Sequence, residues 1–405
     1  MAVNLTAKSA KELPIIDGIQ IYVGQAGVKY ENKNDLTLMV LAPSAQVAGV
    51  FTRNRFCAAP VHVCKEHLQA KKGIRAIVIN TGNANAGTGQ HGLDDAKNIC
   101  TAVAQQVGCD TNQVLPFSTG VILEPLPTSK IISALSKVKP VHWDVAASSI
   151  MTTDTVPKAA TRQITIDGKK VSVTGIAKGA GMIRPNMATM LSFIATDAAI
   201  DSETLSRWVK EIADKSFNCI TVDGDTSTND SFIIIATGKS SLPEINNDNS
   251  DNAIAVKNAL FEVALELATS IVRDGEGATK FITIQINGAK TIEEARKVGY
   301  TIAHSPLVKT AFFASDANLG RLLCAIGNSG IEDLDTDKVA MFLDNVLVAE
   351  NGGRAELYKE EDGARVMKKE EITIRVELQR GSAKTNIYTC DLSHDYVSIN
   401  ADYRS

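Results

Sequence analysis

The stretch from Gly179 to Leu191 contains residue types that could cut the chain's own backbone. Glycines near its start allow a tight turn, and Pro185 fixes the backbone conformation that follows. A hydroxyl directly after a peptide carbonyl can attack that carbonyl when the bond is held strained, and the Ala188–Thr189 step offers this arrangement. The acyl group would move from nitrogen to oxygen, and water would then split the ester.

Cleavage at this step would make Thr189 a catalytic nucleophile. Its hydroxyl would lie beside its own free α-amino group, which can act as the base. The reference pKa of such an amine is about 7.7–8.0, so a useful fraction is neutral near pH 7. The alternative is that Met187, Met190 and Leu191 belong to an ordinary buried strand or helix after a glycine-rich turn.

A second candidate group lies between residues 114 and 122, where the pattern predicts a strand, a turn and another strand. Thr119 and Gly120 fall at the predicted turn. The Thr119 hydroxyl and the Gly120 backbone N–H are donors that no bulky group blocks. Two such donors could hold the negative oxygen of a tetrahedral acyl-transfer intermediate.

These segments closely resemble the ornithine acetyltransferase (glutamate N-acetyltransferase) family of arginine biosynthesis, over nearly the whole chain. The resemblance rests on KGAGMIRPNMATMLSFIATD at 178–197, the Ser-Thr-Gly step at 118–120, DGEGATK at 274–280 and the C-terminal tail. It implies cleavage between Ala188 and Thr189, giving an alpha chain 1–188 and a beta chain 189–405 of the same protein. It also implies that Thr189 is the nucleophile and that Thr119 and Gly120 form the oxyanion hole.

The same resemblance implies a set of substrate contacts spread along the chain. They are Thr155, Lys178, Thr189, Glu276, Asn400 and Ser405. A lysine can bind a carboxylate, and a glutamate is a fitting partner for an amine such as that of ornithine. In the family, the NTGNAN loop at 80–85 also lies near the active site. Without the resemblance, these residues would be taken as solvated side chains and polar turns.

The implied activity is transfer of acetyl from N2-acetyl-L-ornithine to L-glutamate through an acetyl-threonine intermediate, with no cofactor. Some family members also use acetyl-CoA as a donor, and the sequence does not decide whether this chain does. One alternative is an N-terminal-nucleophile aminopeptidase or amidase, in which water resolves the acyl-enzyme. Another is a small-molecule binding protein that never cuts itself. The resemblance further implies a dimer of cleaved protomers.

The composition restricts the possible partners and surroundings of the chain. Its 405 residues have a net charge of −4 without a block of Lys or Arg, which argues against a nucleic-acid surface. No segment is long and apolar enough to span a bilayer, and the first residues lack the apolar core of a signal peptide. Seven scattered cysteines favour free thiols in a reducing cytoplasm over disulfides or a zinc site, and we expect no metal site. The loop at 223–230 lacks the pattern of a calcium loop and is expected to be a turn beside the active site.

Repeated strand and helix patterns predict an α/β fold that would position these residues. The predicted strands are 36–40, 77–79, 281–286, 339–348 and 372–378, the predicted helices are 94–107, 202–212 and 253–272, and a hairpin is predicted over 164–173. The resemblance implies a layered αββα core like that of N-terminal-nucleophile enzymes over 1–280. It implies a smaller C-terminal α/β lobe over 281–405, with a tail that returns to the active site.

Overall fold

The computed structural model describes residues 2–184 and 190–401 of the chain, which divides into two compact units. We call Thr6–Asn218 together with Asp225–Ile271 the core unit. The C-terminal unit consists of Met1–Leu5, Cys219–Gly224 and Val272–Ser405. Ala188, Thr189 and Ser405, which the sequence analysis assigns to the site, lie outside the described residues.

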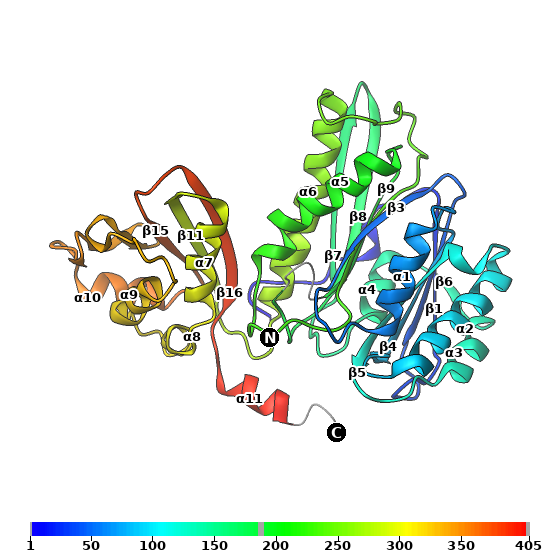
Figure 1. The fold of residues 1–405 in the computed structure, drawn as a ribbon, viewed down its shortest axis with the longest axis horizontal. Coiled ribbons are helices and arrows are strands. Elements are labelled where there is room, and N and C mark those ends of the chain that lie inside the picture. The colour runs from blue at the N-terminus through cyan, green and yellow to red at the C-terminus, as the bar shows by residue number, and fades with distance from the viewer. Residues whose placement is uncertain (1, 185–189, 402–405) are drawn as a thin grey trace. The chain divides into compact units, whose positions relative to one another are not determined.

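The core unit contains two five-stranded sheets (Figure 1). The first has the order β5-β4-β2-β1-β6, with β1 at Ile19–Gly24, β2 at Leu36–Leu41, β4 at Ala76–Asn83, β5 at Val114–Val121 and β6 at Lys139–Val141. The second has the order β3-β10-β9-β8-β7, with β3 at Gln46–Phe51, β7 at Lys158–Ile166, β8 at Lys169–Lys178, β9 at Leu191–Thr196 and β10 at Ser231–Ala236. The helices of this unit are α1 at Ala59–Gln69, α2 at Gly89–Val107, α3 at Thr128–Leu135, α4 at Trp143–Ser149, α5 at Ser202–Lys215 and α6 at Asp251–Arg273.

Alternation along the strands divides the apolar side chains of the first sheet between two hydrophobic cores. On β2, Met39 and Leu41 enter a core shared with β8, β9 and β10 of the second sheet, so the two sheets pack face to face. Leu36 and Leu38 point the other way, into a core with α2 and α3. Because α5 and α6 pack on the second sheet, the layers run helix, sheet, sheet, helix (Figure 1). The predicted αββα order is confirmed.

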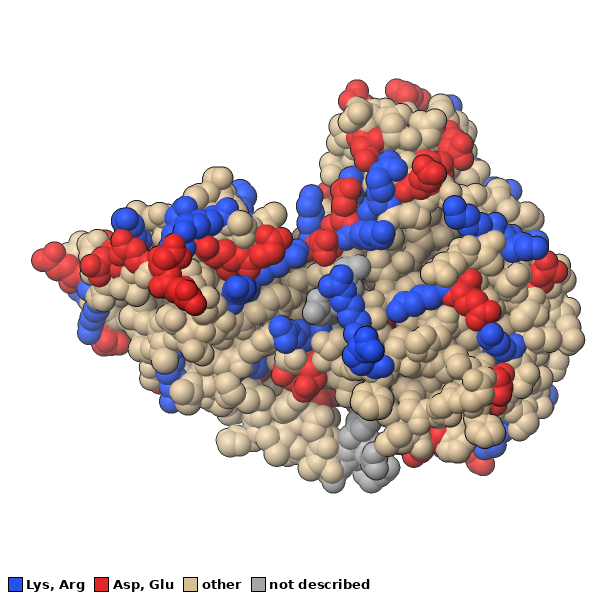
Figure 2. All heavy atoms as spheres, in the orientation of Figure 1, with Lys and Arg blue, Asp and Glu red and all other residues tan. Residues whose placement is uncertain are grey.

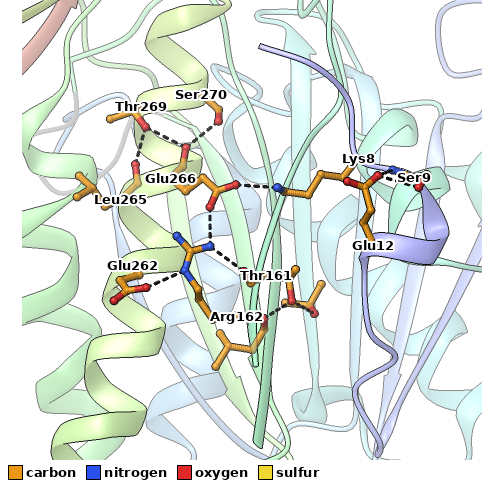
Figure 3. Close-up of polar contacts among 12 residues, drawn as sticks. Lys8, Ser9, Glu12, Thr161, Arg162, Glu262, Leu265, Glu266, Thr269 and Ser270 are labelled. Atoms are coloured by element: carbon orange, nitrogen blue, oxygen red, sulfur yellow. Dashed lines mark hydrogen bonds and ion pairs between the residues drawn. The ribbon is translucent and has the colours of Figure 1, made fainter. Parts of the chain in front are cut away.

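Ion pairs fasten α6 to the edge strand β7 and to the N-terminal segment. Figure 3 shows the Glu266 carboxylate between two cations, with Lys8 Nζ 3.0 Å from Oε1 and Arg162 Nη1 2.7 Å from Oε2. The same guanidinium reaches Glu262, with Nε 2.7 Å from Oε2. These side chains are about one-third to one-half exposed, so we expect each pair to contribute no more than about 1 kcal/mol. Their main effect is to fix where α6 lies along β7.

The C-terminal unit is built on a six-stranded mixed sheet with the order β14-β13-β12-β15-β11-β16. Its strands are β11 at Phe281–Ala289, β12 at Ala340–Leu343, β13 at Val346–Glu350, β14 at Gly353–Arg354, β15 at Glu371–Glu377 and β16 at Ala383–Cys390. Its helices are α7 at Ile292–Ala303, α8 at Pro306–Phe313, α9 at Leu319–Gly327, α10 at Glu360–Met367 and α11 at His394–Ala401. Apolar side chains from α7 to α10 and from the sheet form one core. The predicted smaller C-terminal α/β lobe is confirmed.

Two element predictions are wrong. Residues 114–121 form the single strand β5, because Thr119 and Gly120 stay paired with β4 where a turn was expected. Residues 339–348 were expected to form one strand, but Asp344 adopts a left-handed backbone (φ 50°) and turns the chain between β12 and β13. All seven cysteines are free, as expected. In the described part of the chain, none of the helices has the apolar length that a bilayer crossing requires.

Candidate active site

Two side chains from different sheets meet at the edge of the space between them. On β5, Leu115 and Phe117 enter the inter-sheet core, so Thr119, two residues further along, faces the same side. On β8, Lys178 follows Ile176 in the same way. The Lys178 ammonium donates a hydrogen bond to the Thr119 hydroxyl, with Nζ 3.0 Å from Oγ1. A hydroxyl that accepts from an ammonium keeps its own O–H as a donor, so this pair suits an anion.

Gly120 occupies a backbone position that only glycine can fill. Its φ of +134° is outside the range of ordinary L residues, and an added Cβ would lie 2.2 Å from the carbonyl carbon of Gly82. The cause is the close approach of the parallel strands β4 and β5, whose register shifts at Gly82. Gly120 therefore allows these two strands to stay in contact beside Thr119.

The NTGNAN segment at 80–85, whose first four residues end β4, lies beside this strand end. The Ser118 hydroxyl donates to Asn80 Oδ1 over 2.6 Å, and Asn80 Nδ2 donates to the carbonyl of Asn83 over 2.9 Å. Asn229 joins the cluster from the 223–230 loop, because its Nδ2 donates to the carbonyl of Ser118 over 2.8 Å. The Thr226 hydroxyl of the same loop donates to the carbonyl of Arg184. The loop is thus a turn that contacts the candidate cleavage segment at Arg184.

Asp154, which was not among the residues expected at the site, has a completely buried side chain. Its Oδ1 lies 2.6 Å from Lys158 Nζ and accepts from the backbone N–H of Gly179 over 2.7 Å. Its Oδ2 accepts from the N–H of Thr152 over 3.0 Å. The carboxylate therefore ties the 152–158 turn to the first residue of the glycine turn, directly after Lys178. The signal that could have revealed it is an Asp four residues before a Lys, next to a predicted strand.

The charge of Asp154 is strongly stabilised. Burial by itself would raise the pKa of Asp154, but the charges of Lys158 and Lys178 and the Gly179 N–H outweigh it. The pKa of this carboxyl is held well below its usual value. Lys178 brings a positive charge directly against the Thr119 hydroxyl, which suits a carboxylate or an oxyanion. Thr155, a further predicted contact in this unit, is exposed on the same turn.

In the C-terminal unit the structure brings together Glu276 and Asn400, both predicted substrate contacts. Glu276 is buried, and Asn400 Nδ2 donates to its Oε2 over 2.8 Å. The tail that contains Asn400 packs on the DGEGATK turn. A Cβ on Gly277 (φ +70°) would lie 2.6 Å from the backbone N of Tyr396, and the Ser393 hydroxyl donates to the carbonyl of Gly277. The tail thus returns to this turn and places an amide beside its carboxylate.

The ends of the candidate cleavage segment lie opposite each other. Lys178, the last residue of β8, is paired with Leu191, the first residue of β9, in an antiparallel register. Thr189 precedes Leu191 by two residues in the sequence. Across the described ranges, no three His, Cys, Asp or Glu side chains converge as a metal site requires.

Comparisons with known proteins give consistent matches. The model of the ArgJ family matches residues 20–405. The arginine biosynthesis bifunctional protein ArgJ of Neisseria meningitidis serogroup A is 63% identical over 406 residues, covering 100% of both chains. The protein of the same name from Neisseria gonorrhoeae strain FA 1090 is 62% identical over the same length.

Two solved structures are also similar in sequence to parts of the chain. The ArgJ structure from Bacillus halodurans is 36% identical, with a TM-score of 0.49, and covers 52% of this chain and 97% of its own. Ornithine acetyltransferase from Mycobacterium tuberculosis, solved with ornithine, is 31% identical with a TM-score of 0.36, covering 44% of this chain and 94% of its own.

Proposed function

The chain belongs to the ArgJ family of arginine biosynthesis, and from this premise we propose that it transfers acetyl from N2-acetyl-L-ornithine to L-glutamate. The observation that carries the proposal is the hydrogen bond from Lys178 to Thr119, 59 residues apart in sequence. This bond joins the Lys178 ammonium and the Thr119 hydroxyl at the end of β8, and the end of β8 is paired with the start of β9. Thr189, two residues before β9, is the proposed nucleophile.

The proposed reaction has a maturation step and two half-reactions. Cleavage between Ala188 and Thr189 frees the Thr189 amine, which takes the proton of the Thr189 hydroxyl. The oxygen attacks the acetyl carbonyl of acetylornithine, the C–N bond breaks, and ornithine leaves with the proton. Glutamate then attacks the acetyl ester through its amine, the C–O bond breaks, and Thr189 regains its proton. Thr119 and Gly120 hold the oxyanion of each tetrahedral intermediate.

The buried Glu276 supports an amino acid with a cationic side chain as substrate. Its carboxylate can pair with the side-chain amine of ornithine, and Asn400 holds it in place. The M. tuberculosis relative was solved with ornithine, and the Neisseria relatives are named bifunctional. We therefore include acetyl-CoA as a second acetyl donor, with Thr155, Lys178 and Ser405 as further substrate contacts. We also propose a dimer of cleaved protomers that works in the cytoplasm.

One experiment separates this function from its rivals. Purified protein is analysed by mass spectrometry and by N-terminal sequencing of each chain, and acetylornithine consumption is followed with and without glutamate. We expect two chains, the second beginning at Thr189, and turnover that requires glutamate. Consumption without glutamate would instead show an amidase, and an intact chain without turnover would show a binding protein.

We expect Thr119→Val to lower kcat about 10²–10³-fold, because it removes one oxyanion donor and little volume. The transfer of acetyl from acetylornithine to glutamate is measured on the cleaved protein alone. The extent of cleavage is measured separately, so a defect in cleavage is not mistaken for a defect in kcat. Thr119→Ser is the matched control, since it retains the hydroxyl and should stay within a few-fold of the wild type. A valine variant with nearly normal kcat would contradict the role of Thr119.

We expect Glu276→Gln to raise the KM for acetylornithine about tenfold or more, with a smaller change in kcat. A charged hydrogen bond contributes about 1.5–3 kcal/mol, and glutamine retains the shape but not the charge. Initial rates over a range of acetylornithine concentrations measure the effect. Glu356→Gln, at an exposed position of the same unit, is the control and should leave KM unchanged. An unchanged KM in the Glu276 variant would exclude an ion pair with substrate.

A further inference from the structure

The core unit contains a groove that has no role in the proposed transfer of acetyl from acetylornithine to glutamate. It is a cavity of about 760 Å³ between β3, α1 with the turn after it, and α5. Its lining is rich in cations, namely Lys65, Lys71, Lys72, Arg207 and Lys210, with Glu203 as its acidic residue. Figure 2 shows Lys and Arg side chains on this face over α5, β3 and α1, with Asp and Glu side chains among them.

Four of these five cations have no carboxylate within ion-pair distance among the described residues. In the residues that the structure describes, Lys65, Lys71, Lys72 and Lys210 form no ion pair, whereas Arg207 faces Asp248 at 3.6 Å. Several ammonium groups around one groove favour a ligand with several negative charges, and phosphate groups are the usual choice.

The sheet leads from this groove toward the proposed nucleophile. The groove follows β3 from Gln46 to Phe51, and Lys65 Nζ lies 5.9 Å from the Phe51 ring centroid at that end. Phe51 is paired with Ser231 on β10, which is paired with Leu191 on β9. Two strand spacings place Phe51 about 10 Å from Leu191. Leu191 follows Thr189 by two residues.

We propose that this groove binds the nucleotide end of acetyl-CoA. The phosphates lie among the lysines, the half-buried Val47 and Leu68 offer apolar surface to the adenine, and the pantetheine arm follows β3 toward Phe51. Acetylornithine and glutamate have no phosphates and are too small to need a groove of this size. The inference rests on the proposed function, in which acetyl-CoA is the second donor.

The chemistry of this donor uses the same nucleophile. The Thr189 oxygen attacks the thioester carbonyl, the C–S bond breaks, and the hydroxyl proton goes to the CoA sulfur. The resulting acetyl ester then passes to the glutamate amine as in the exchange reaction. The groove is therefore needed for one donor and not for the other, which makes the two activities separable.

The test neutralises the groove in the mature full-length enzyme, with Lys→Gln at Lys65, Lys71, Lys72 and Lys210. The control makes the same charge change at exposed lysines of the C-terminal unit, namely Lys297, Lys359, Lys368 and Lys384. We expect the groove variant to raise the KM for acetyl-CoA at least about tenfold, or about 1.4 kcal/mol. Acetylornithine–glutamate exchange should stay within about twofold in both variants, and the control should keep its KM for acetyl-CoA.

Binding measured by calorimetry gives a readout that does not depend on activity. Wild-type protein should bind CoA and adenosine 3′,5′-bisphosphate, and the groove variant should lose both. An unchanged KM for acetyl-CoA together with unchanged CoA binding would overturn the proposal. So would wild-type binding of ATP but not CoA, which would make the groove a site for another nucleotide. Exchange activity in the wild type tests the proposed function separately, so failure of one idea is not mistaken for failure of the other.

Discussion

Thr189→Ala is expected to leave a single uncut chain of 43.2 kDa without acetyl transfer from either donor. The substitution removes the hydroxyl that attacks the Ala188 carbonyl and the same hydroxyl that later accepts the acetyl group. Loss of a covalent nucleophile lowers kcat by at least about 10³-fold, and here no mature enzyme should form at all. Denaturing gels and intact mass report maturation, and acetylornithine–glutamate exchange reports turnover.

Thr189→Ser separates the hydroxyl from the rest of the side chain. Serine provides the same oxygen and the same α-amine after cleavage, so two chains and measurable exchange should persist. If the alanine variant is cut and active, neither the maturation step nor the acetyl-threonine intermediate can stand. If the alanine variant is uncut but active, the acetyl transfer uses a nucleophile other than Thr189.

The sequence correctly predicted those helix and strand ends that are set by a capping or turn residue at the end itself. Asp201 caps α5 by accepting from the N–H groups of Glu203 and Thr204, and the Asp167-Gly168 turn joins β7 to β8. Gly108, in a left-handed conformation, ends α2 at the predicted residue. At 114–122 pairing with a distant strand overrode such signals, whereas at 339–348 a local turn at Asp344 was overlooked. Thr119 and Gly120 resemble a turn, but β4 holds them in a strand.

The candidate site was predictable in its members but not in its contacts. Thr119 and Lys178 were identified by resemblance, and no local pattern could show that they touch across two sheets. Asp154 escaped because its sequence context is a polar turn, which predicts exposure. Its burial follows from packing against Gly179, 25 residues away. The position of the Asp154 charge is therefore set by tertiary contacts, and removing this charge should have a large effect.

Asp154→Asn is expected to destabilise the core unit and to reduce exchange activity. Lys158 has an entirely buried side chain, and removing the carboxylate charge beside its ammonium costs roughly 3–5 kcal/mol. Asparagine can still accept from the Gly179 N–H, so the change mainly removes charge. The mature variant should unfold at a clearly lower urea concentration. Its Lys178 ammonium, now beside a neutral group, should hold Thr119 less well, which lowers kcat.

The pH dependence of unfolding shows whether the stability lost in Asp154→Asn is due to the charge of Asp154 or to the shape of its side chain. The folded-state pKa of Asp154 lies below the value of about 3.9 that an unfolded aspartate has, so its charge stabilises the fold fully above that pH. As pH falls below about 4, this stabilisation is lost progressively, and the difference between wild type and Asp154→Asn should shrink. Above about pH 5 the difference should be constant.

Adding Lys158→Met to Asp154→Asn tests the cause of the instability directly. The double variant removes both charges of the buried pair and should recover much of the stability that the single variant loses. Activity should recover less, since the anion beside Lys178 is still missing. If the double variant is no more stable than Asp154→Asn, the buried pair is not what holds the 152–158 turn to Gly179. If its activity recovers fully, Asp154 acts only through Lys158 and has no part in placing Lys178 against Thr119.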